Sequence, residues 1–190
     1  MRHGETAWSL SGQHTSHTDL PLTPHGEAEA QALGTLLAGV AFAHVFTSPR
    51  RRARRTAELA GHADAIVEPD LAEWDYGDYE GRRSTEIHAQ RPHWDIYVDG
   101  CPGGESPDQI TARADRLIAR WRALPGRVAV FSHGHFGRVL TVRWIGLPLV
   151  AAKHFGLNTA SCGILDYDPG HLAARIVQWN RTAAPLGSPG

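Results

Sequence analysis

Histidines, arginines and carboxylates stand at the places where buried strands are expected to end. RHG occupies residues 2–4, TSPRRRAR begins at residue 47, and FSHGH ends the apolar run VAVFS. A fourth segment, LAEWDYGDYEG, begins at residue 71 and is rich in carboxylates and aromatic rings. In open α/β sheets functional groups gather at the carboxyl ends of strands, so we expect these segments to meet in one cleft.

The residue types in these segments favour phosphoryl transfer. Guanidinium groups present planar forks that match phosphate oxygens. A neutral imidazole can attack phosphorus, and a carboxylic acid can protonate the leaving oxygen. Because the transferred group spreads its charge over its equatorial oxygens, cations aimed at those oxygens lower the barrier without a metal. We expect no cofactor.

Strands that alternate with helices must position these groups. The patterns predict helices in 22–40, 49–60, 106–124 and 133–146, and strands in 44–48, 65–68, 128–132, 161–167 and 173–179. Thr23 and Ser106 are suitable N-caps, each followed by a proline. In the first helix we place Ala28 and Leu33 on the inward face. This order predicts an α/β fold with a largely parallel sheet covered on both faces.

The four segments, in this order, resemble those of the histidine phosphatase, or phosphoglycerate mutase-like, superfamily. The resemblance runs from Arg2 to about Tyr167. WSLSGQHTSHTDLPLTPHGE, EWDYGDYEG and DGCPGGES are most similar to the phosphatase branch, in particular to sedoheptulose-1,7-bisphosphatase-like and actinobacterial acid phosphatase members. The resemblance implies a single three-layer αβα sandwich over residues 1–182, and we expect 183–190 to be a disordered tail.

The resemblance also implies a catalytic set. His3 is the nucleophile that becomes phosphohistidine, and Arg2 and Arg52 hold the phosphate oxygens. His133, acting protonated, donates to the same phosphate. Glu73 is the general acid and then the base for water.

The substrate-binding residues that we predict are the same set without His3, together with two glycines and two polar residues. The glycines allow a close backbone approach to the ligand, and Gly4 is expected to donate its N–H. The added residues are Gly4, Ser9, Gln13 and Gly134.

Structural interpretations of these residues remain open. His3 by itself is compatible with a frayed terminus, and His135 with a structural role as much as with the pocket. The arginines of 50–55 form mostly a solvated helix face, from which only Arg52 is expected to enter the cleft. Glu73 competes with three nearby carboxylates, those of Asp75, Asp78 and Glu80. DGCPGGES is compatible with no more than a turn and a helix cap.

The sequence departs from the resembling family in two respects, the first of which separates phosphatases from mutases. Mutases of that family carry an arginine where Gln13 stands, and a longer insert with a basic cluster between the equivalents of Gly81 and Gly100. We therefore predict a metal-independent phosphomonoesterase that acts on small phosphorylated metabolites, with sugar phosphates as the favoured substrate class. The alternatives are a phosphoglycerate mutase and a phosphate-binding protein without turnover.

The second departure lies at the N-terminus. Relatives have an apolar strand before RHG, whereas only Met1 precedes Arg2 here. We expect a start codon assigned too late or a trimmed chain. A genuine start would deprive the nucleophile of its anchoring strand.

Composition excludes several other classes of function. The chain has 190 residues and a net charge of −1, so no basic excess points to nucleic acid. No apolar segment has membrane-spanning or signal-peptide character, and we expect a cytoplasmic protein with reduced cysteines. Twelve histidines raise the question of a metal site. The closest pairs, His14 with His17 and His133 with His135, lack a completing ligand cluster, so we expect none. The oligomeric state stays open.

Overall fold

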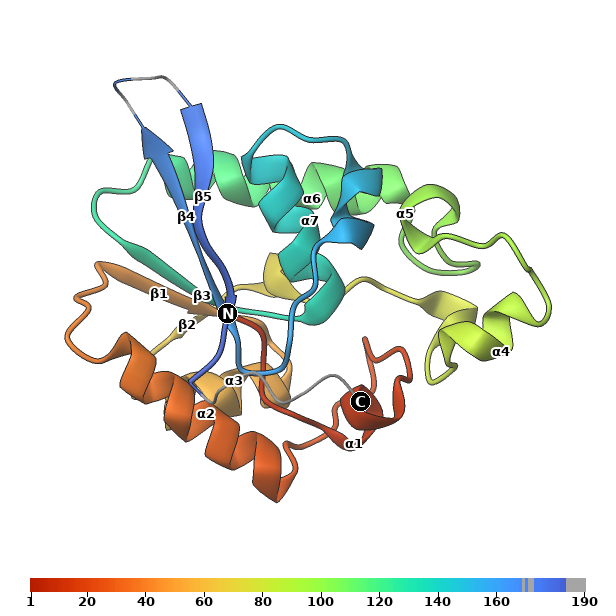
Figure 1. Ribbon diagram of the computed structural model, residues 1–190, viewed down its shortest axis with the longest axis horizontal. Helices are drawn as coiled ribbons and strands as arrows, with labels where there is room; N and C mark the ends of the chain where they lie inside the picture. Colours follow the sequence, from red (N-terminus) through yellow and green to blue (C-terminus); the bar gives the residue numbers. More distant parts are fainter. Residues whose placement is uncertain (169, 171–172, 184–190) are drawn as a thin grey trace.

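Helices cover both faces of a short parallel sheet in the computed structural model, which describes residues 1–168, 170 and 173–183 (Figure 1). The expected α/β fold is confirmed. Strand β1 (His44–Thr47) lies in the centre and pairs in parallel with β2 (Ile66–Val67) and β3 (Val128–Phe131). The expected tail, apart from residue 183, lies outside the described residues.

The last two strands form a separate antiparallel pair. Strand β4 (Cys162–Asp168) pairs with β5 (Ala173–Arg181). The first residues of the chain join this pair to the parallel sheet. Arg2 forms a parallel bridge with Ser132 at the end of β3, and its N–H donates to the carbonyl of Ser161 just before β4.

Backbone hydrogen bonds fix the first three residues between the two sheets. The Met1 amine donates to the Val130 carbonyl at 2.7 Å, and the Met1 carbonyl accepts from Ser132 at 2.8 Å. His3 donates to the Ser132 carbonyl and accepts from Ala160, both at 3.0 Å. These few residues therefore hold His3 from both sides, in the position where the sequence predicts the end of a longer strand.

Each face of the parallel sheet carries its own pair of helices and its own core. Helices α2 (Pro24–Leu37) and α3 (Arg51–Leu59) cover one face, and α6 (Pro107–Arg122) and α7 (Gly134–Trp144) cover the other (Figure 1). Side chains alternate between the faces along each strand. In β1, Phe46 joins the core under α6 and α7, which includes Leu71, Trp74, Ile110, Leu117, Phe136 and Val139. In β3, Phe131 joins the smaller core under α2 and α3, with Leu33, Ala57, Ala60, Ala160 and Cys162.

The predicted helix starts are confirmed. The Thr23 side chain accepts from the N–H of Gly26, and Ser106 forms a capping box with Gln109. The inward face of α2 differs from the prediction, because Gly26, Ala30 and Leu33 are buried and Ala28 is exposed. Burial of Gly26 brings the start of this helix directly against the backbone of residues 4 and 5.

Several short elements were not predicted. They lie mainly in the two long connections before α2 and α6, where helix α5 and its neighbour α4 project to one side of the sandwich (Figure 1). These elements are α1 (Ala7–Ser11), η1 (Pro69–Leu71), η2 (Gly77–Tyr79), α4 (Ser84–His88), α5 (Ile96–Asp99) and η3 (Leu149–His154). Within the described part of the chain, every helix is too short or too polar to cross a membrane.

Candidate active site

His3 lies at the carboxyl end of the joined sheets, with 5% of its surface exposed. Its Nδ1 lies 2.7 Å from the carbonyl oxygen of Gly4. Since a carbonyl only accepts, Nδ1 carries the proton and Nε2 keeps its lone pair. Burial lowers the pKa of His3 well below 6.5, and the charges of Arg52 and Arg2 lower it further. The ring is therefore a neutral imidazole, the form that can attack phosphorus.

The ring of His133 stands edge-on to His3, with 5.2 Å between the centroids. Its Nδ1 accepts from Nε of Arg52 at 3.3 Å, and its Nε2 lies 2.6 Å from the hydroxyl of Ser48. Because a guanidinium only donates, His133 is the neutral tautomer with its proton on Nε2. Burial, followed by the charge of Arg52, lowers its pKa well below 6.5. His133 is therefore neutral in this structure, and the protonated form expected during the reaction stays a prediction.

Arg52 is the arginine of residues 50–55 that contacts His133. It is fully buried, whereas Arg51 and Arg54 are exposed. Its guanidinium donates to three carbonyls of one loop, those of Thr15 (3.0 Å), Ser16 (3.3 Å) and Thr18 (3.1 Å).

Glu80 holds the loop that receives Arg52. Its carboxylate accepts the N–H groups of Ser16 at 2.9 Å and Thr18 at 3.0 Å. Glu80 therefore orients the carbonyls on which the buried guanidinium rests. Glu80, which the sequence offers only as an alternative to Glu73, therefore has a structural role in this loop.

Arg2 reaches the start of α7. Its NH1 donates to the carbonyl of Leu157 at 2.6 Å, while Nε is a buried donor without a hydrogen-bond partner among the described residues. A Cβ placed on Gly134 would lie 3.4 Å from this Nε. Arg2 and Gly134 are therefore neighbours, as the predicted set requires. A buried N–H without an acceptor is suited to an anion.

Glu73 occupies the N-terminus of α7. Its Oε1 accepts the N–H groups of Trp74 (3.0 Å) and Phe136 (2.8 Å), and its Oε2 accepts that of His135 (3.0 Å). The first turn of a helix favours a negative charge. Oε2 accepts only one of these bonds, which leaves it a second lone pair for a proton.

The rival carboxylates have other partners or none in the site. Asp75 pairs with His17 at 3.1 Å, with more than a third of its side chain exposed, and Asp78 is exposed to solvent. Only 6% of the surface of Glu73 is exposed. Of the four, the geometry brings Glu73 to the helix start beside Arg2.

Gly4 has a packing role instead of the predicted ligand contact. Its N–H donates to the hydroxyl of Thr56 at 3.0 Å. A Cβ at this position would lie 2.3 Å from the carbonyl oxygen of Gly26. The close backbone approach that Gly4 permits is therefore an approach to α2.

Ser9 and Gln13 also use their side chains within the protein. The Ser9 hydroxyl accepts from the N–H of Thr6 at 2.8 Å and donates to the Thr6 carbonyl at 3.0 Å. The Gln13 amide donates to the carbonyl of Gly81 at 2.8 Å and accepts from Ser11 at 2.6 Å. These bonds shape the loop around the site, and neither side chain is directed by them toward His3.

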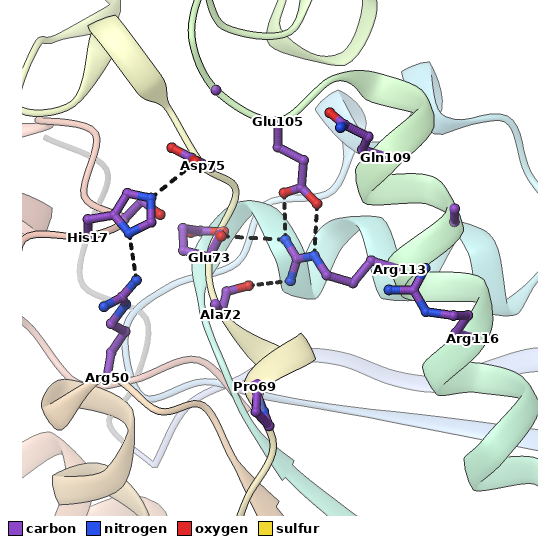
Figure 2. Close-up of a pocket in the computed structure, with 13 residues that line it drawn as sticks. His17, Arg50, Pro69, Ala72, Glu73, Asp75, Glu105, Gln109, Arg113 and Arg116 are labelled. Atoms are coloured by element: carbon purple, nitrogen blue, oxygen red, sulfur yellow. Dashed lines mark hydrogen bonds and ion pairs between the residues drawn. The ribbon is translucent and has the colours of Figure 1, made fainter.

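A groove of about 510 Å³ lies on the other side of Glu73 (Figure 2). Most of the residues that line it have polar or charged side chains, and in Figure 2 the His17 ring lies between Arg50 and Asp75. The groove is lined by Ser16, His17, Arg50, Pro69, Ala72, Glu73, Asp75, Gly104, Glu105, Gln109, Ala112, Arg113 and Arg116. Glu73 thus lines this open space and also binds the start of α7, which directly follows His133.

Aromatic rings pack behind the start of α7. His14 stacks on Tyr76 with 4.6 Å between centroids, and the Tyr76 hydroxyl lies 2.8 Å from Nδ1 of His135. Burial lowers the pKa of His14 to about 4 and that of His135 well below 6.5. His135 therefore has a structural contact through its ring and a contact to Glu73 through its N–H.

These groups can transfer a phosphoryl group through His3. The site offers a neutral nucleophile, a second neutral imidazole, two guanidiniums and a carboxylate. In the described residues, no three His, Cys, Asp or Glu side chains are grouped so that they could hold a metal ion.

Three functional contacts were not predicted from the sequence. The Ser48 hydroxyl accepts the Nε2–H of His133, the Thr56 hydroxyl accepts the N–H of Gly4, and Glu80 orients the loop that holds Arg52. Ser48 directly follows β1, so its position at a strand end was a usable signal. Nothing local marks the other two.

Comparison with known proteins agrees with this geometry. Residues 1–182 match the model of the histidine phosphatase superfamily (branch 1). An acid phosphatase of Mycobacterium tuberculosis is 43% identical over 90% of this chain and 86% of its own length. The sedoheptulose 1,7-bisphosphatase of Saccharomyces cerevisiae is 40% identical over 77% of this chain and 66% of its own.

Solved structures give the same result. The product of a Mycobacterium tuberculosis open reading frame superposes with a TM-score of 0.91 at 41% identity, covering 96% of each chain. The family match spans nearly the whole chain and includes all four segments at the strand ends. The chain therefore belongs to branch 1 of the histidine phosphatase superfamily and is a phosphatase of that superfamily.

Proposed function

We propose that this protein is a metal-independent phosphomonoesterase that hydrolyses small phosphorylated metabolites, above all sugar phosphates, through a phosphohistidine at His3. The observation that carries the proposal is the state of the His3 ring. Its Nδ1 proton is held by the Gly4 carbonyl, its pKa is lowered well below 6.5, and cations flank it. Such a ring offers an unprotonated Nε2 to an anionic substrate at neutral pH.

In the first step Nε2 of His3 forms a bond to phosphorus, and the bond from phosphorus to the leaving oxygen breaks. Protonated Glu73 delivers its proton to that oxygen. Arg2 and Arg52 bind the equatorial oxygens, on which charge remains in a loose transition state. His133 donates from a ring nitrogen, and the anionic phosphate raises its pKa toward the charged form when it binds.

In the second step water attacks the phosphohistidine. The Glu73 carboxylate accepts the proton of that water, the bond from Nε2 to phosphorus breaks, and its electron pair returns to the ring. Inorganic phosphate leaves. One carboxylate thus serves as acid and then as base, and its position at the groove and at the start of α7 supports both roles.

The substrate class rests on the groove and on the relatives. A volume of about 510 Å³ is in the usual range for a small-molecule site. The polar side chains among its lining residues could bind a leaving group with several hydroxyls. The yeast relative is named for a sugar bisphosphate, and the mycobacterial relative is named an acid phosphatase.

Trapping of the intermediate tests the proposal. Brief incubation with a ³²P-labelled sugar phosphate, followed by denaturation, is expected to give an acid-labile and base-stable phosphoprotein. His3→Ala should form none, while His25→Ala, which changes an exposed histidine at the start of α2, should label like the parent. Label retained by His3→Ala would reject the nucleophile.

Product analysis separates the alternatives. Net release of inorganic phosphate supports the phosphatase. Interconversion of monophosphoglycerates that is faster than phosphate release would show a mutase instead. Calorimetric binding of phosphate without hydrolysis of any phosphate ester would show a binding protein.

A further inference from the structure

The segment GGES before α6 and an arginine inside that helix line the groove beside Glu73 but have no chemical step in the proposed reaction. Arg113 is 9% exposed and forms a bidentate pair with Glu105, with distances of 2.8 and 2.7 Å. Figure 2 shows this guanidinium between the Glu105 carboxylate and the chain that carries Glu73. We infer that Arg113 and Glu105 are positioning residues that aim the Glu73 carboxyl group at the leaving oxygen.

Arg113 binds the main chain that carries the acid. Its NH1 donates to the carbonyls of Asp70 and Ala72, both at 2.7 Å, and its NH2 faces the carbonyl of Glu73 at 3.4 Å. One charged, planar group therefore fixes three carbonyls of residues 70–73. Bidentate and charge-assisted contacts of this kind are strong and specify orientation.

The same guanidinium also supports the group that receives the acid. It lies 4.0 Å from the centroid of the Phe136 ring. The N–H of Phe136 donates to Oε1 of Glu73 at 2.8 Å. Arg113 thus contacts both ends of the interaction, the backbone from which Glu73 extends and the residue that holds its carboxylate.

Glu105 completes the brace from the other side. Its carbonyl accepts from Nε1 of Trp74 at 2.8 Å, and its N–H donates to the carbonyl of Asp75 at 2.9 Å. A Cβ on Gly104 would lie 2.3 Å from that same carbonyl, so the two chains are in direct contact here. Residues 70–75 are therefore bound to Arg113 of α6 on one side of Glu73 and to the segment before α6 on the other.

The inference rests on the proposed role of Glu73 as acid and base, and it predicts a leaving-group-dependent loss. An alkyl alcohol leaves only with a proton, whereas p-nitrophenolate leaves without one. Arg113→Lys keeps the charge and loses the fork. It should lower kcat/KM for a sugar phosphate about 100-fold and that for p-nitrophenyl phosphate less than about threefold.

Dephosphorylation supplies a second readout. Because Glu73 also activates water, the Arg113→Lys enzyme should accumulate phosphohistidine at steady state with p-nitrophenyl phosphate as substrate. Glu105→Gln, which keeps the size of the side chain, should show the same two effects more weakly and serves if the lysine variant does not fold. Combining Arg113→Lys with Glu73→Gln should cost little beyond Glu73→Gln alone, since both act through one carboxyl group.

Arg143→Lys is the matched control. Arg143 also forms a bidentate pair between α7 and α6, with Asp115 at 2.8 and 2.9 Å, but it does not contact residues 70–75. Arg143→Lys should leave unchanged the ratio of kcat/KM for the sugar phosphate to kcat/KM for p-nitrophenyl phosphate. Thermal unfolding of each variant reports the purely structural cost.

Two outcomes separate the inference from the function on which it depends. If Glu73→Gln lowers kcat/KM equally for the sugar phosphate and for p-nitrophenyl phosphate, the acid role itself fails. If Glu73→Gln is selective for the sugar phosphate while Arg113→Lys and Glu105→Gln lower both substrates equally or neither, the acid role stands and the positioning role is overturned.

Discussion

The start of α2 presses on the segment that carries the nucleophile, and alanine at Gly26 should disturb it. A Cβ at Gly26 would lie 2.2 Å from the carbonyl oxygen of Glu5, where ordinary contact begins near 3.4 Å. The two backbones must therefore separate by about 1 Å, the deficit between these distances. Glu5 follows His3 by two residues.

The helix cannot simply move away from this contact. The N–H of Thr23 donates to the Glu5 carbonyl at 2.9 Å, and its hydroxyl donates to the Glu5 carboxylate at 2.7 Å. Strain at Gly26 is therefore transmitted toward His3. A displacement of about 1 Å costs a reaction about 100-fold, or roughly 2.7 kcal/mol in the barrier. The overpacking itself should cost about 1–3 kcal/mol of stability.

Steady-state hydrolysis of p-nitrophenyl phosphate, with urea unfolding beside it, measures both effects. Gly34→Ala is the control on the same helix, because its Cβ would lie 3.1 Å from Cα of Ala60 and far along the chain from Glu5. It should keep kcat/KM within about threefold and gain helix propensity of up to about 1 kcal/mol. A folded Gly26→Ala enzyme with kcat/KM within about threefold of the parent would refute the transmission of strain to His3.

Three further results are expected. His14 has a pKa of about 4 in the folded protein and 6.5 when unfolded, so the unfolded state binds more protons below pH 6.5. The free energy of unfolding should therefore decrease as the pH is lowered from 6.5, with a loss of about 3 kcal/mol at pH 4 from this group alone. Urea unfolding at several pH values measures the loss, and His14→Phe should flatten the profile. Ser48→Ala leaves the buried Nε2–H of His133 without an acceptor and should cost about 1–3 kcal/mol of unfolding free energy, so an unchanged urea midpoint would contradict the tautomer. EDTA should leave the hydrolysis rate unchanged, and a loss restored by added zinc would contradict the metal-independent mechanism.

The strand-end residues of the site could be predicted from the sequence because the signal is local. A buried strand followed by polar residues is visible in the letters, and parallel strands bring their carboxyl ends to one edge. The segments that carry Arg52 and His133 were found in this way, the family resemblance then selected the two residues, and the structure places them in contact. Ser48 has the same signal.

The roles of Gly4, Ser9 and Gln13 could not be predicted in the same way. Each depends on a tertiary or capping contact, with Gly26, Thr6 and Gly81 respectively, that leaves no periodic trace. The protonation of His133 also depends on charges distant in sequence, first among them that of Arg52. Residue type indicates what a side chain can do, while its neighbours decide what it does.

The position of His3 between the two sheets has a consequence for how the enzyme comes into being. The backbone partners of residues 1–3 lie in 130–132 and 160–161, so this segment is held by residues more than 100 positions further along the chain. Contacts of such long range form late, because the loop they close must be ordered first. The reactive imidazole therefore stays unaligned until residues 130–132 and 160–161 have folded against it, and catalytic competence arrives with the final steps of folding.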